Sequence, residues 1–91
     1  MENKPWTKPV TLEAAPGTHR VVATTDEASH YLLNRWPVEG GEHYIEARKI
    51  CLDVLAGLRT PDDARAAFIA AAAEAGLPVI DDGEPAREAG G

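Results

Sequence analysis

Apolar and polar residues alternate along the first part of the chain, which is the pattern of β-strands with one buried face. In "PVTLEA" (residues 9–14), Val10 and Leu12 fall on one face, and "HRVVATT" (residues 19–25) has a similar strand character. Between them lies "APGT" (residues 15–18), whose proline and glycine favour a tight turn. The pattern predicts an antiparallel β-hairpin near the N-terminus.

Three later segments carry apolar residues three and four positions apart, which is the spacing of amphipathic helices. The first begins at Thr24 or Thr25, either of which suits the N-cap, and it ends before Pro37. The second runs from about residue 42 to residue 58. The third opens with "TPDD", in which Pro61 suits the first helical position, and continues through "ARAAFIAAAAEAG" to its final glycine.

The short apolar run "LPVI" (residues 77–80) has two interpretations: a third strand beside the hairpin, or a cover for the core. The whole pattern predicts one α+β domain over residues 8–80, in which an N-terminal antiparallel hairpin packs on three α-helices. We expect residues 1–7, which include Trp6, to form a flexible arm. The acidic, glycine-rich residues 81–91 are expected to be a disordered tail.

Composition adds that the core is small. The chain has 91 residues, 44% of them hydrophobic, and only five are aromatic (two Trp, two Tyr and one Phe). Alanine, which buries little area, supplies much of the apolar content. A domain of this size buries about 60–65% of the surface of its unfolded chain. Association with a partner would therefore help to stabilise it.

Charge and cysteine content limit the partners and the compartment. The net charge of −6 argues against nucleic acid as a partner, because that binding depends on lysine and arginine. No apolar run approaches the roughly 20 residues that cross a bilayer, so we expect no membrane partner. The single cysteine forbids an internal disulfide, and the start "MENKPWTKPV" lacks a signal-peptide pattern. We expect a cytoplasmic bacterial protein.

No group of residues has the spacing of a catalytic or metal site. Cys51 falls on the apolar stripe of the second helix, so we interpret it as a buried structural residue. His43 and Cys51 are offset by about 80° on a helix, and motifs such as C-x-x-C and H-E-x-x-H are absent. Gly40 and Gly41 precede a helix as in phosphate loops, but Glu42 and other nearby glutamates would repel an anion. We therefore expect no cofactor, no metal and no catalytic residue.

Two places remain as candidates for binding. In "NRWPVEGGEHY" (residues 34–44), Trp36 and Tyr44 lie where two apolar stripes meet, which favours a structural joint between two helices. Arg35 and His43 in the same segment have no structural assignment. On the third helix, small side chains cover the side opposite Phe68 and would let another helix approach closely; they are Ala66, Ala70 and Ala73.

The order of several short motifs carries a resemblance over about residues 6–80. These are a tryptophan before "PV", then "EA", "LL" and "WP", then a glycine before tyrosine, then "A…C…L.G" and "AR.AF..AA.EAG". This series resembles a family of short bacterial proteins classed as domain of unknown function number 982. The resemblance implies a small free-standing bacterial domain, and it brings no activity, cofactor or catalytic residue.

Three functions stay open beside nucleic-acid binding, which the acidic charge disfavours. The leading hypothesis is a non-enzymatic protein-interaction module that associates with itself or with an unknown protein partner. The second is a small-ligand-binding domain with a pocket between the hairpin and the Trp36–Tyr44 joint, where Arg35 or His43 would orient an anionic group. The third is an enzyme that uses His43, Glu46 or Cys51.

Overall fold

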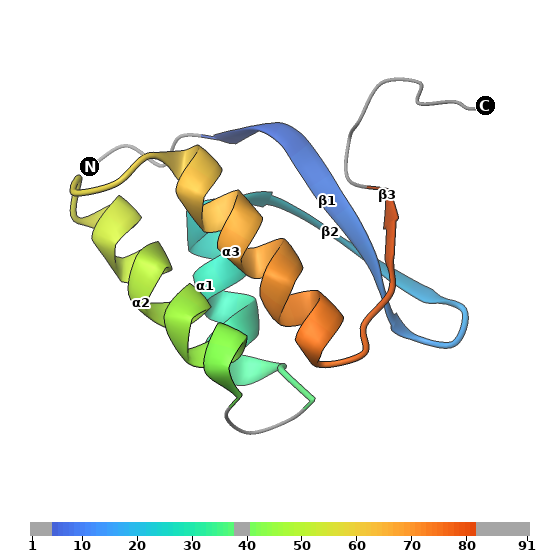
Figure 1. The fold of residues 1–91 in the computed structure, drawn as a ribbon. Coiled ribbons are helices and arrows are strands. Elements are labelled where there is room, and N and C mark those ends of the chain that lie inside the picture. The colour runs from blue at the N-terminus through green and yellow to red at the C-terminus, as the bar shows by residue number, and fades with distance from the viewer. Residues whose placement is uncertain (1–4, 38–40, 82–91) are drawn as a thin grey trace.

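The computed structural model describes residues 5–37 and 41–81 of the chain. Its elements, in chain order, are β1 (Pro5–Ala15), β2 (Thr18–Thr24), α1 (Thr25–Asn34), α2 (Glu42–Leu55), α3 (Pro61–Glu74) and β3 (Val79–Asp81). The protein has the predicted α+β fold, with an N-terminal hairpin followed by three helices (Figure 1).

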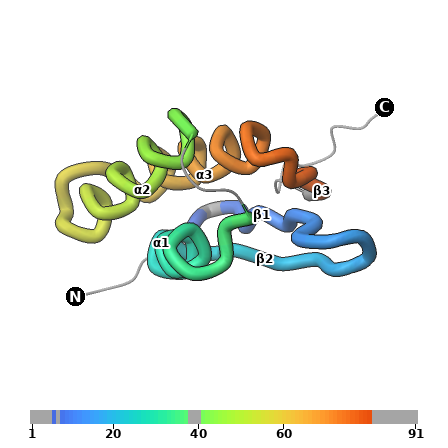
Figure 2. The backbone as a smooth tube through the Cα atoms, turned by 90° about the horizontal axis from the view of Figure 1, so that it is seen from below, coloured from blue at the N-terminus to red at the C-terminus, as the bar shows by residue number. Residues whose placement is uncertain are grey.

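The elements form two layers. The sheet has the order β2-β1-β3 and both pairings are antiparallel. Figure 2 shows α1 beside β1 and β2 in one layer, with α2 and α3 side by side in the other. The helical pair therefore covers one face of the sheet and of α1, and the core lies between the layers.

The alternation in the hairpin decides which face of the sheet is buried. Val10 pairs with Val22, and these two side chains and that of Leu12 are buried under the helices. The run at residues 77–80 does add a strand: Leu12 pairs with Val79, and the N–H of Glu13 donates to the carbonyl of Pro78 at 2.9 Å. The third strand was one of the two interpretations left open by the sequence.

The start of the chain differs from the prediction of a flexible arm over residues 1–7. β1 begins at Pro5, and Trp6 is only 4% exposed. The Trp6 indole Nε1 donates a buried hydrogen bond to Thr25 Oγ1 at 3.0 Å. The arm was therefore wrong for residues 5–7, because burial of a large ring outweighs the weak strand pattern around it. Residues 1–4 lie outside the described part of the chain.

At the other end, Asp81 is the last residue of β3, so the strand takes in the first residue of the predicted tail. Residues 82–91 lie outside the described residues.

The two threonines that competed for the first N-cap have separate roles. Thr24 is the N-cap of α1, since its Oγ1 accepts from the N–H of Glu27 at 3.0 Å. The Glu27 carboxylate in turn accepts from the N–H of Ala23 at 2.8 Å. Thr25 is left free to accept the indole N–H of Trp6, which ties the start of α1 to β1.

The second helix is shorter than predicted. α2 ends at Leu55, because Gly57 adopts a φ of +85° and the N–H of Leu58 turns back to the carbonyl of Asp53 at 2.7 Å. The third helix begins as predicted, with Thr60 as N-cap and Pro61 in the first turn. The two helices are therefore joined by a short turn and lie antiparallel to one another (Figure 1).

All five aromatic rings of the chain belong to one connected cluster centred on Phe68, which is fully buried. The Phe68 ring centroid lies 5.9 Å from that of Trp6, 6.2 Å from that of Tyr31 and 5.7 Å from that of Trp36. Trp36 in turn contacts Tyr31 edge-on at 5.6 Å and stacks on Tyr44 at 6.1 Å. The cluster therefore joins β1, all three helices and the segment that follows α1.

Truncation of Phe68 should remove the centre of this cluster. We expect Phe68→Ala to lower the free energy of unfolding by about 3–5 kcal/mol, since it leaves a cavity among three rings. Urea denaturation measures the change. The control is Ala73→Ser on the exposed side of the same helix, which should shift stability by less than about 0.5 kcal/mol. A similar small loss for Phe68→Ala would mean that the rings do not hold the elements together.

Candidate functional site

The structure distributes the seven candidate residues over three places. Trp36 and Tyr44 are half-buried members of the aromatic cluster. Arg35 lines a hollow between β2 and α1. The other four lie on the second layer: His43, Ala66 and Ala70 line a groove between α2 and α3, and Ala73 is exposed outside the lining of that groove.

The predicted joint between the first two helices is present. The rings of Trp36 and Tyr44 stack with an interplanar angle of 22°, and the Tyr44 hydroxyl donates to the carbonyl of Leu32 at 3.0 Å. The Arg48 guanidinium covers the Tyr44 ring, with Cζ 5.5 Å from its centroid. Through these contacts, both rings pack between α1 and α2.

The start of α2 is capped by a side chain from the end of α3. Glu74 accepts from the N–H of His43 through Oε2 and from the N–H of Tyr44 through Oε1, both at 3.0 Å. The N–H of His43 contributes most to holding the pKa of the Glu74 carboxyl below its ordinary value of 4.5. Gly41 has a φ of +104°, and a Cβ atom there would lie 2.5 Å from Glu74 Oε1. The Glu74 carboxylate thus occupies the place that a bound anion would take at the start of α2. Gly40, the other glycine of the predicted turn, lies outside the described residues.

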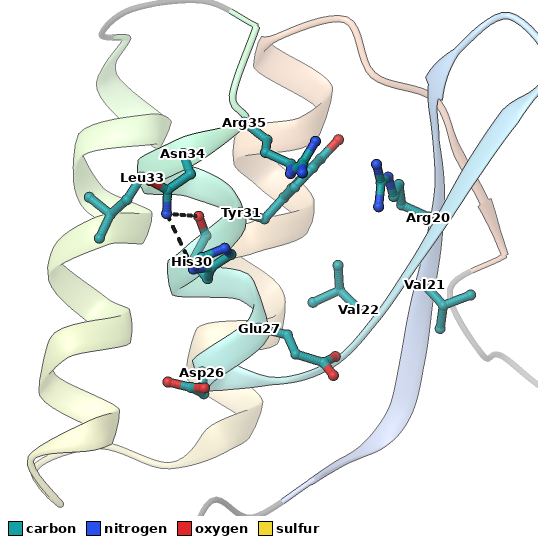
Figure 3. Close-up of a pocket in the computed structure, with 10 residues that line it drawn as sticks. All are labelled: Arg20, Val21, Val22, Asp26, Glu27, His30, Tyr31, Leu33, Asn34 and Arg35. Atoms are coloured by element: carbon teal, nitrogen blue, oxygen red, sulfur yellow. Dashed lines mark hydrogen bonds between the residues drawn. The ribbon is translucent and has the colours of Figure 1, made fainter.

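The hollow between β2 and α1 has a volume of ≈ 530 Å³, which exceeds the ≈ 280 Å³ of a groove between α2 and α3. We call it the β2–α1 hollow. Its lining comes from Arg20, Val21 and Val22 on β2, from Asp26, Glu27, His30, Tyr31, Leu33 and Asn34 on α1, and from Arg35 just after α1 (Figure 3). Because α1 follows β2 directly, the hollow is closed near Thr24 and opens toward the other ends of both elements.

Charge is divided between the two ends of the hollow. Arg20 and Arg35 face one another across the open end, whereas Asp26 and Glu27 lie at the closed end (Figure 3). Neither arginine forms an ion pair with a carboxylate in the part of the chain that the structure describes. The Tyr31 ring is 7% exposed, and its hydroxyl points toward the arginine end.

The α2–α3 groove is smaller, with a volume of ≈ 280 Å³. It is lined by His43, Glu46, Ile50, Arg59, Asp63, Ala66, Ala67 and Ala70. Its arginine is already paired, since Arg59 lies 3.6 Å from a carboxylate oxygen of Asp53 and 3.9 Å from one of Asp63. The groove therefore offers small apolar side chains beside an arginine that is already paired with carboxylates.

Cys51 is fully buried in the core, as the sequence predicted. Burial raises the pKa of its thiol to about 11, so the group stays protonated at neutral pH. Among the described residues, no group of three or more His, Cys, Asp or Glu side chains is placed to hold a metal ion. No described helix combines the length and the apolar character needed to span a membrane.

A family model described as "Protein of unknown function (DUF982)" matches residues 8–79 of this chain. The chain belongs to the DUF982 family. A similar solved structure is the NMR structure of the Agrobacterium tumefaciens protein Atu1219, which is 33% identical and superposes with a TM-score of 0.72. The match covers 96% of this chain and 88% of that one. No curated protein matches the chain.

Membership of DUF982 confirms the resemblance that the sequence motifs carried. The family description states no activity, so the function of this DUF982 protein has to be argued from its own residues.

Sequence reasoning missed three residues that define these places: Arg20, Tyr31 and Glu74. Arg20 shares a strand face with Val22, two positions away, so its orientation toward the helices was available from the alternation. No local pattern in the sequence relates Arg20 to Tyr31 and Arg35. These residues come close to Arg20 only because of the angle between β2 and α1. Glu74 lies about thirty residues from the amides that it caps, and nothing in its own helix marks that role.

The cap by Glu74 predicts a pH-dependent contribution to stability. Because folding lowers the pKa of this carboxyl, the contribution is fully present above its ordinary value of 4.5 and is lost as the pH falls through the folded value. We expect Glu74→Gln to be less stable than the wild type at pH 7, and the difference to shrink steadily between pH 5 and more acidic conditions. Urea denaturation across this pH range measures it.

The matched control is Glu46→Gln, an exposed glutamate on α2. The stability of Glu46→Gln should differ little from that of the wild type at every pH. If the Glu74→Gln difference is independent of pH, the negative charge is not what stabilises the start of α2.

Proposed function

We propose that the protein is a non-enzymatic binding domain whose ligand site is the β2–α1 hollow, where Arg20 and Arg35 receive an anionic group. The observation that carries the proposal is the pair of arginines at one end of a hollow of ≈ 530 Å³, neither of which forms an ion pair with another described residue. The chain has a net charge of −6, so two such cations facing one another form a local positive site on an acidic protein.

The chemistry of the lining favours a carboxylate with an apolar body. A guanidinium presents a planar fork of donors that matches a carboxylate, and the Tyr31 hydroxyl offers a further donor at the same end. Apolar contact comes from Val22 and Leu33 in the same lining. The carboxylates of Asp26 and Glu27 at the closed end would repel a second negative charge, which disfavours polyanions.

The same lining supports binding over catalysis. It contains neither a cysteine nor a serine that would act as a nucleophile. His30 could serve as a base, but its Nδ1 already lies 3.2 Å from the amide nitrogen of Asn34. Cys51 lies in the core, away from the hollow.

The arginines should dominate the affinity for a small probe anion. Benzoate, a carboxylate with an apolar ring, is expected to shift the NMR signals of Arg20, Tyr31 and Arg35 at millimolar concentration. Arg20→Gln and Arg35→Gln should each weaken binding about tenfold or more, since each removes hydrogen bonds to a charged group. A rise in salt should weaken it further.

Arg48→Gln is the control, because Arg48 lies over the Tyr44 ring and takes no part in lining the hollow. It should leave the benzoate affinity unchanged. Equal losses for all three variants would indicate that benzoate senses only the net charge of the protein.

A second candidate is self-association through the α2–α3 groove. Its support is the groove of ≈ 280 Å³ lined by Ala66 and Ala70, whose small side chains leave room for a helix of a second copy. Ala73 continues the exposed alanine surface on α3.

Self-association predicts a dimer in sedimentation experiments at micromolar concentrations. We expect Ala70→Glu to shift the protein to the monomer, because it would bury a carboxylate at the contact. Ala56→Glu, at the exposed residue just after α2 and outside the groove, is the control and should remain dimeric. A wild-type protein that stays monomeric at high micromolar concentration would remove this candidate.

A further inference from the structure

We propose that the occupant of the β2–α1 hollow is the C-terminal end of a partner polypeptide, which adds as a strand to the free edge of β2 and places its terminal carboxylate between Arg20 and Arg35. This rests on the proposed function, since the carboxylate takes the anion position described above. It adds the identity of the ligand and the backbone contacts that would hold it.

The outer edge of β2 is open to such a strand. β1 is the central strand of the sheet, so among the described elements β2 has a strand neighbour on one side only. The N–H of Ala23 donates to the Glu27 carboxylate at 2.8 Å, which shows that this amide points away from β1 and toward α1. Since backbone groups alternate along a strand, the N–H and C=O of Val21 point to the same outer edge.

Ala23 and Val21 differ in whether their outward backbone groups already have a hydrogen-bond partner. Glu27 occupies the amide of Ala23 at the closed end. No hydrogen bond joins the outward backbone groups of Val21 to another described residue outside the sheet, and Val21 lines the hollow. An incoming strand can therefore form its first ladder hydrogen bonds at Val21, with α1 as the opposite wall.

Charge fixes the direction of the incoming strand. β2 runs from the arginine end of the hollow toward the acidic end, from Thr18 to Thr24. A strand antiparallel to β2 would begin near Asp26 and finish near Arg20. Its terminal carboxylate would meet the two guanidiniums, whereas a parallel strand would bring its carboxylate to Asp26 and Glu27 and be repelled.

The length of the hollow gives the spacing within the partner. Thr24 lies four positions after Arg20, and at about 3.3 Å per position this corresponds to roughly 13 Å. A lysine or arginine three or four positions before the partner's C-terminus would then face Asp26. Side chains that alternate toward the helices would contact Val22 and Leu33, so we expect aliphatic residues at those positions.

The test uses the full chain and three fluorescein-labelled hexapeptides of the sequence TKVTVV. The first has a free C-terminal carboxylate and the second a C-terminal amide. The third has the free carboxylate, but its backbone nitrogen opposite Val21 is methylated so that it cannot donate. We expect the first peptide to bind at least tenfold more tightly than either of the others in fluorescence polarisation, and to slow exchange of the Val21 amide hydrogen.

Variants of the protein provide the matched controls. Arg35→Gln should weaken binding of the free-acid peptide about tenfold. It should leave the affinity for the amide peptide, which is already low, unchanged. Arg48→Gln should leave the affinity of all three peptides as in the wild type.

The outcomes separate this inference from the proposed function. If benzoate binds at Arg20 and Arg35 but the free-acid peptide binds no more tightly than benzoate and leaves Val21 unchanged, strand addition is overturned and the anion site stands. If the methylated peptide binds as well as the first, the backbone contacts are absent and strand addition is again overturned. If neither benzoate nor any peptide binds, the anion site itself is wrong.

Discussion

Phe68 occupies the place where β1, α1 and α3 come together, and its ring contacts those of Trp6, Tyr31 and Trp36. An aromatic side chain buries about 150–250 Å², whereas the buried alanines around it contribute little area each. Five fully buried alanines line the same core: Ala28, Ala47, Ala64, Ala71 and Ala72. The alanines let the two layers approach closely, and the rings join elements of both layers through direct contacts. Phe68 therefore links β1, α1 and the segment after α1 to α3 through its ring contacts.

The same contacts shape the hollow. Trp6 is held against Phe68 on one side and donates its indole N–H to Thr25 on the other, which fixes the start of α1 relative to β1. Tyr31, whose ring contacts those of Phe68 and Trp36, fixes the far part of the helix. The angle between β2 and α1 follows from these two attachments. The hollow is thus set by core packing, and its polar residues lie on elements that are rigidly supported.

Local patterns in the sequence were sufficient to predict those elements whose position depends on neighbouring residues alone. Alternation located the hairpin, and N-caps with proline located the start of the third helix. The irregular pairing of β1 between Pro5 and Val10 hid the strand around Trp6, because a bulge removes the period that marks a strand. Arg35 was identified as a candidate from its segment alone. Arg20 and Tyr31 were not identified, because they come close to Arg35 only through the angle between β2 and α1, which no spacing in the sequence encodes.

The cap between α2 and α3 has a consequence for how this chain can change over evolutionary time. Glu74 closes the start of α2 only because position 41 carries no side chain, and the backbone there already requires glycine by its φ. A side chain at position 41 would displace the Glu74 carboxylate and would also strain the backbone, because of the positive φ. Replacing Glu74 would remove the steric conflict but not the backbone strain. Position 74 is different, since a shorter polar residue there would meet no steric conflict with Gly41. Substitutions in this pair should therefore have a preferred order, in which position 74 changes first and Gly41 persists after its partner has been replaced.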